Sequence, residues 1–169
     1  MRTLLLSMLF IITIDCAAQS WLTKIDSSAF NGITKKCEVR GKTDDKTYKS
    51  PVFQISYSTK TKQTKAYLTY MPYGGCTTGF YPVKIKFDSD ITTYQMDVNY
   101  SDSDGYDILI FVSDKAMASR PHKHLLSYNK MIEKLRTSKV MYLKYLSSCA
   151  KIEIEFPLDG ANEALAILR

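Results

Sequence analysis

The sequence is poor in the side chains on which most enzymes depend. Its only histidines, His122 and His124, lie two residues apart in the run RPHKH. No serine lies in a G-x-S-x-G nucleophile turn, and neither a glycine-rich phosphate loop nor an H-E-x-x-H motif is present. The three cysteines beyond residue 18 have nothing nearby in sequence that would activate a thiol. These absences argue against an enzyme, so we expect no catalytic residues.

Two short segments resemble metal sites, and each has a plainer interpretation. The H-x-H pair would suit a transition metal, but the flanking lysine and arginine favour an exposed loop. Residues 102–107 (DSDGYD) alternate carboxylates as calcium loops do, yet the closing glutamate of such a loop is missing. An Asp-Gly pair between two strands is typical of a hairpin turn. We therefore expect no metal ion and no cofactor.

Long apolar runs are also missing, apart from residues 4–14 (LLLSMLFIITI). This run follows one basic residue and precedes Cys16-Ala17-Ala18, which is the layout of a secretory signal peptide cleaved before Gln19. The run is too short to span a membrane, which needs about 20 apolar residues. An alternative to the signal peptide is that this run forms a buried helix. Lipidation of Cys16 would make a lipoprotein, but Asp15 disfavours it. We expect residues 1–18 to be the signal peptide of a periplasmic or secreted protein and residues 19–169 to form one domain without a transmembrane span.

Cysteine is scarce as well, and Cys16 would leave with the signal peptide. Cys37, Cys76 and Cys149 would remain, which allows one disulfide and one thiol in an oxidising compartment. No CxxC motif is present, so a structural bridge is preferred, and all three pairings stay open. The third thiol could be buried, reactive or bonded to a second chain, and we favour burial.

Positive charge is in excess, with a formal net charge of +6. The lysines are scattered, which favours a solvated basic surface but leaves an anionic envelope surface open as a partner. We expect no nucleic-acid partner. Tyrosines gather near Gly74-Gly75-Cys76, where they serve either as sheet-face side chains or as a contact surface beside lysines. The contact surface predicted in this way consists of Tyr70, Tyr73, Tyr81, Lys84 and Lys86.

Alternating apolar and polar residues predict several short strands. Residues 83–87 (VKIKF) are a clear example, with lysines on one face and apolar side chains on the other. A stripe at Tyr128, Met131, Ile132 and Leu135 predicts a helix, and residues 140–156 predict a hairpin that is followed by a terminal helix. We expect a mainly β, α+β fold, which is an antiparallel sheet or β-sandwich with one internal and one C-terminal helix.

The C-terminal segment resembles a known group of exported proteins. Residues 131–135 (MIEKL), 140–146 and 156–160 (FPLDG), followed by EAL and LR in the last helix, are similar to the end of the TagO/VasI-like accessory proteins of type VI secretion. Invasion-associated protein B-like periplasmic proteins have a similar strand, L-x-G and helix ending. The resemblance implies a similar fold and an envelope location.

Together these features predict an exported, non-catalytic envelope protein that acts by protein–protein binding, as an accessory of a secretion machine. The alternative is a periplasmic immunity or inhibitor protein that blocks a toxin or hydrolase. A third class is an exported hydrolase that uses aspartate and tyrosine residues. The genes beside this one would discriminate between the first two.

Overall fold

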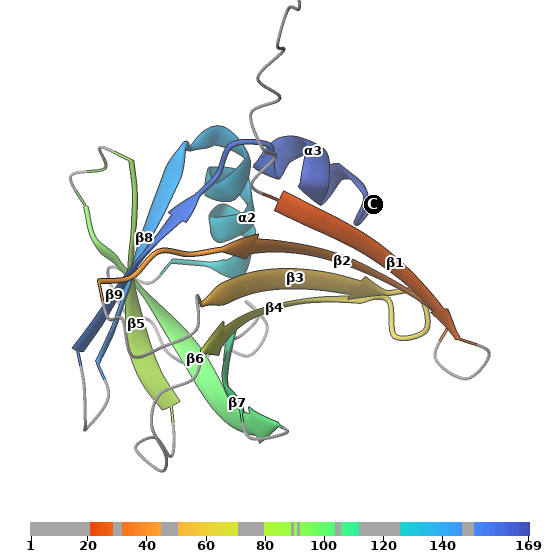
Figure 1. Cartoon of the computed structure of the whole chain (residues 1–169), viewed down its shortest axis with the longest axis horizontal. Helices are drawn as coiled ribbons and strands as arrows, with labels where there is room; N and C mark the ends of the chain where they lie inside the picture. Colours follow the sequence, from red (N-terminus) through yellow and green to blue (C-terminus); the bar gives the residue numbers. More distant parts are fainter. Residues whose placement is uncertain are drawn as a thin grey trace, which may run out of the picture.

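The computed structural model of the chain describes residues 21–28, 32–44, 51–70, 80–88, 90, 92–103, 106–111, 126–146 and 151–169. Within these ranges nine strands pair antiparallel in the order β1-β2-β3-β4-β7-β6-β5-β8-β9 (Figure 1). The strands are β1 (Trp21–Ser28), β2 (Gly32–Arg40), β3 (Val52–Ser58), β4 (Gln63–Tyr70), β5 (Phe80–Phe87), β6 (Tyr94–Ser103), β7 (Tyr106–Phe111), β8 (Val140–Leu146) and β9 (Lys151–Pro157).

The alternating pattern of the sequence places one face of the sheet in the core. In β5, Val83, Ile85 and Phe87 are buried, whereas Lys84 between them is exposed. The strands β3, β4, β8 and β9 add alternate apolar side chains to the same core cluster. The mainly β, α+β fold class predicted from this pattern is confirmed.

The ends of the strand order come together through the segment that follows β2. The Lys42 amide donates to the Glu155 carbonyl at 2.8 Å, and the Glu155 amide donates back to the Lys42 carbonyl at 2.9 Å. Strand β9 therefore continues the edge of β2 beyond the stretch that β1 covers. Inside this closure the Phe53 ring lies 5.6 Å from the Phe111 ring and 5.9 Å from the Phe156 ring.

Two helices, α2 (Tyr128–Thr137) and α3 (Ala161–Ala166), lie side by side in the upper part of Figure 1, between β8 and β1. Helix α2 begins after Ser127, whose hydroxyl accepts a hydrogen bond from the Lys130 amide at 3.2 Å, and it buries Met131 and Leu135. The predicted internal and C-terminal helices are therefore both present. No helix in the described ranges has the length and apolar character needed to cross a membrane.

Candidate functional site

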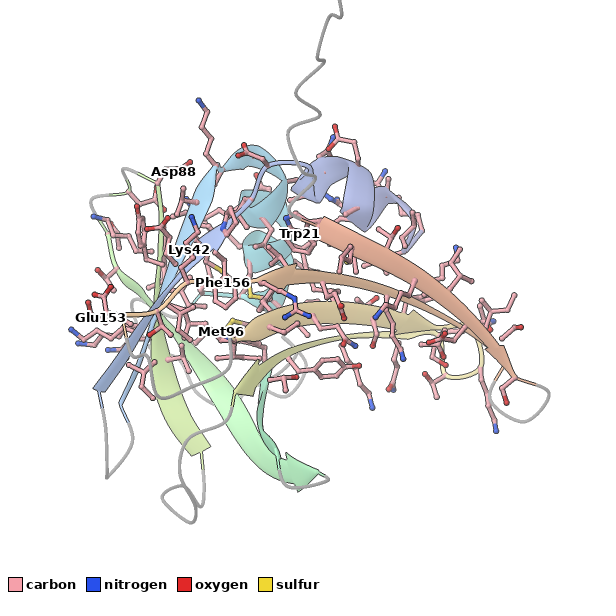
Figure 2. The ribbon with its side chains drawn as sticks, in the orientation of Figure 1. Trp21, Lys42, Asp88, Met96, Glu153 and Phe156 are labelled. Atoms are coloured by element: carbon pink, nitrogen blue, oxygen red, sulfur yellow. The ribbon has the colours of Figure 1, made fainter. Side chains whose placement is uncertain are left out.

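A groove of about 780 Å³ lies on the face of the sheet opposite the core, across β5, β8 and β9. The chain after β2 forms one of its walls, because the Lys42–Glu155 pairing holds this segment against β9. Figure 2 shows Lys42 and Glu153 at the β9 side of the molecule, away from Trp21 and α3. The polar and aromatic side chains that line the groove are Lys42, Thr43, Asp44, Lys84, Lys86, Thr93, Tyr142, Lys144, Glu153 and Glu155.

Strand register arranges these side chains in two rows across the groove. In the first row Lys84 of β5 lies opposite Lys144 of β8, which lies opposite Glu153 of β9. In the second row the order is Lys86, Tyr142 and Glu155, and Lys42 follows on the far side of β9. The two rows are neighbours because each strand contributes one residue to each row. These two residues are two positions apart in the strand, so their side chains point to the same face.

The first row contains a pair of like charges. Lys84 and Lys144 are direct cross-strand partners, an arrangement that destabilises a sheet. Glu153 forms an ion pair with Lys144, with 2.8 Å between Nζ and Oε1, and so neutralises one of the two ammonium groups. The Lys84 side chain is exposed and has no hydrogen bond or ion pair with any described residue. An anionic group bound beside Lys84 would relieve the remaining repulsion.

Tyr142 occupies the middle of the second row and has 42% of its surface exposed. It is one of four large hydrophobic or aromatic side chains with this degree of exposure in the described part of the chain. An exposed tyrosine offers a rigid apolar ring and a hydroxyl, and this residue is common where proteins bind one another. The groove therefore combines an aromatic contact with four lysines and three carboxylates.

The structure brings together only part of the contact surface predicted from the sequence. Lys84 and Lys86 both line the groove. Tyr70 and Tyr81 lie in β4 and β5, but their side chains are outside the described part, and Tyr73 is outside it altogether. Sequence inspection missed Tyr142, Lys144 and Glu153, although the alternating pattern of β8 and β9 already placed their side chains on the polar face.

Cys37 lies in the core and does not line the groove. Its side chain is fully buried, and the thiol donates to the Ile55 carbonyl at 3.6 Å. Burial raises the pKa of Cys37 to about 12, and the hydrogen bond with Ile55 offsets only part of that effect. Cys37 is a free thiol in the structure, whereas Cys76 and Cys149 lie outside the described residues.

The structure places no metal site among the residues that it describes. Within them no three histidine, cysteine, aspartate or glutamate side chains gather closely enough to hold a metal ion. The predicted H-x-H loop at His122 and His124 lies outside the described residues, as does the signal peptide at residues 1–18. Strands β6 and β7 pair antiparallel as far as Ser103 opposite Tyr106, and the predicted Asp-Gly turn at residues 104–105 lies outside the described residues.

The strand order and the two helices define a class of fold that is also found in a protein of known structure. The chain is similar to the crystal structure of invasion associated protein B from Bartonella henselae, with a TM-score of 0.55 and 12% sequence identity. The match covers 89% of this chain and 92% of that one. It shows a shared fold. No protein-family model matches the sequence, and no curated protein matches it closely.

Proposed function

We propose that the protein is an exported, non-catalytic envelope protein that binds another protein through the groove on β5, β8 and β9. The observation that carries this proposal is the exposed Tyr142 among charged side chains on the polar face of the sheet. The likeness to an invasion-associated protein supports an envelope role through the fold. The signal-peptide pattern of residues 1–18 supports export.

The charges of the groove favour a partner segment that carries a carboxylate. Lys84 and Lys86 lie two residues apart on the same face, and neither side chain has a hydrogen bond or ion pair with a described residue. Glu153 is engaged by Lys144, so the region nearest Lys84 is positively charged. An acidic side chain of the partner would bind there while an apolar neighbour packs on the Tyr142 ring.

Site-specific crosslinking tests the groove directly in the cell that makes the protein. A photoreactive amino acid at position 142 should give one discrete adduct, whose partner is then identified by mass spectrometry. The same amino acid at Glu163, an exposed position on α3, is the matched control and should not give that adduct. Adducts that are absent at position 142, or are the same from both positions, would contradict the proposal.

Charge reversal tests the predicted chemistry of the partner once it is known. The double variant Lys84→Glu, Lys86→Glu should weaken binding by about tenfold or more, because two attractive contacts become repulsive. The double variant Lys62→Glu, Lys65→Glu changes the net charge equally at exposed positions outside the groove and should bind like the wild type. The partner's identity separates the functions: a secretion component supports an accessory role, whereas a toxin or hydrolase supports an immunity or inhibitor role.

A further inference from the structure

The outer edge of β1 has no strand-pairing partner among the described residues. Within the described residues β1 is the last strand of its side of the sheet, and only β2 pairs with it. All of its residues after Trp21 are exposed. Natural proteins seldom leave an edge of this length open, because its backbone groups can pair with another chain.

The backbone hydrogen bonds of β2 show which backbone groups of β1 face outward. The Ile33 carbonyl of β2 accepts from the Thr59 amide, and the Gly41 amide just after β2 donates to the Pro51 carbonyl. The backbone N–H and C=O groups of odd-numbered residues in β2 therefore point toward β3. The backbone N–H and C=O groups of even-numbered residues in β2 therefore point toward β1, where Lys36 is the partner of Lys24. It follows that the N–H and C=O groups of even-numbered residues in β1 point to β2, and those of Thr23, Ile25 and Ser27 point to the open edge.

The side chains along this edge are complementary to themselves when the strand is reversed. In an antiparallel pair centred on Ile25, the Ile25 side chains of two copies lie opposite each other. Thr23 then lies opposite Ser27, and Lys24 lies opposite Asp26, on both sides of the two-fold axis. The pairs centred on Thr23, Ile25 and Ser27 are the hydrogen-bonded ones, and the Lys24–Asp26 pairs are the closer, non-hydrogen-bonded ones.

Exposed apolar surface coincides with the centre of this arrangement. Ile25 has 64% of its surface exposed, and Ile33, its diagonal neighbour on β2, has 43% exposed. Both side chains lie on the same face of the β1–β2 hairpin as Trp21 and Val39. Those two residues are paired at the start of β1 and are buried in the core. Two copies joined at the edge would bring four isoleucines together on this face.

The charges of β1 remain favourable in such a pair. Within one copy Lys36 lies 2.9 Å from Asp26, and Lys24 lies 3.4 Å from Glu38. The second copy adds its Asp26 beside Lys24 and its Lys24 beside Asp26, so each charge gains an opposite neighbour. We propose that two copies of this chain associate through β1, which makes one continuous antiparallel sheet across the dimer.

Two single variants and their mixture test this pairing. In the purified chain, Lys24→Asp makes the edge wholly acidic and Asp26→Lys makes it wholly basic. Each variant alone should dissociate about tenfold more readily than the wild type, because both cross-axis pairs become repulsive. An equimolar mixture should form the mixed dimer, since every cross-axis pair is then between opposite charges. Sedimentation velocity measures the mass, and circular dichroism confirms that each variant is folded.

A second variant removes the backbone contribution alone. Ile25→Pro deletes an N–H that points to the open edge, so the β1–β2 hydrogen bonds are retained while the dimer loses its central pair. Leu22→Ala, which shortens an exposed side chain away from the axis, is the control and should leave the dimer intact. A wild-type chain that stays monomeric into the millimolar range, or a dimer that all these variants leave unchanged, would overturn the proposal. Neither result bears on the groove, which lies on other strands.

Discussion

At the scale of single residues, Gly41 shows how closely the chain approaches itself at the closure of the sheet. A Cβ at this position would lie 2.5 Å from Cγ2 of Ile154 and 2.6 Å from Cε1 of Phe156, both of which are buried. Neither neighbour can move without disturbing the core, because interiors are close-packed.

We therefore expect Gly41→Ala to lower the free energy of unfolding by about 1–3 kcal/mol, the usual cost of overpacking. Urea unfolding followed by circular dichroism measures this change. Arg40→Ala, at the neighbouring exposed position, should change stability by less than about 0.5 kcal/mol. A Gly41→Ala protein as stable as the wild type would show that the segment after β2 does not pack as closely as described.

Cys37 leads to a prediction about thiol chemistry. Since the native thiol has a pKa of about 12 and is fully buried, iodoacetamide at pH 8 should leave it unmodified until the protein unfolds. Unfolding without reductant should then expose one reactive thiol, and peptide mapping should place the label on Cys37. That result leaves Cys76 and Cys149 as the disulfide. A bridged Cys37 peptide would contradict it.

The raised pKa of Cys37 also determines how this thiol affects the free energy of unfolding at alkaline pH. The folded pKa of Cys37 is raised, so its contribution is fully present below pH 9.0, the ordinary value of the unfolded thiol. Between pH 9.0 and about 12 the unfolded chain loses the proton while the folded chain keeps it, and stability falls. The Cys37→Ala variant should lack this part of the alkaline decline.

At the scale of elements, Asp88 links the end of β5 to the start of β8. Its carboxylate accepts hydrogen bonds from the Lys139 amide at 2.8 Å and the Val140 amide at 2.7 Å, and its own amide donates to the Val140 carbonyl. Asp88 has a φ of 39°, a left-handed conformation that aspartate and asparagine tolerate better than most residues.

Asp88→Ala should lower the free energy of unfolding by about 1.5–3 kcal/mol, because two backbone amides lose a charged acceptor. Asp88→Asn should cost less, since its amide oxygen still accepts and its backbone tolerance is similar. Asp44→Ala, which removes another exposed carboxylate, is the control for charge and should be nearly neutral. Equal loss in Asp88→Ala and Asp44→Ala would mean that the link contributes nothing. Thermal unfolding gives the comparison.

The elements also show what the sequence can and cannot predict. Strand β5 was predictable because burial alternates with its lysines, and α2 because Met131 and Leu135 form one stripe. Strand β1 was missed as a clear strand, since only Trp21 is buried and no alternation appears. The groove was missed because Lys42, Lys84 and Tyr142 are far apart in sequence. Only the order β5-β8-β9 and the closure at Lys42 bring them together.

At the scale of the whole molecule, one core cluster joins the first strand, the other strands and both helices. Trp21 belongs to it, along with Phe53 of β3, Leu135 of α2 and Leu165 of α3. A single core of this kind should unfold in one cooperative step, as small domains usually do. The edge strand β1 is the part most exposed to independent opening, because most of it lies outside this core.

Trp21 makes the cooperativity measurable, since it is the only tryptophan and has 2% of its surface exposed. Its fluorescence reports on β1 and circular dichroism reports on the whole sheet, so the two urea transitions should share one midpoint. A Trp21 transition at lower urea would mean that β1 opens by itself and that residues 19–169 are not one cooperative unit. If two copies pair through β1, the midpoint should also rise with protein concentration, because dimerisation stabilises the folded state by mass action. The Lys24→Asp chain should show that concentration dependence only at about tenfold higher protein concentration while keeping a single transition, which separates the stability of the domain from that of the dimer.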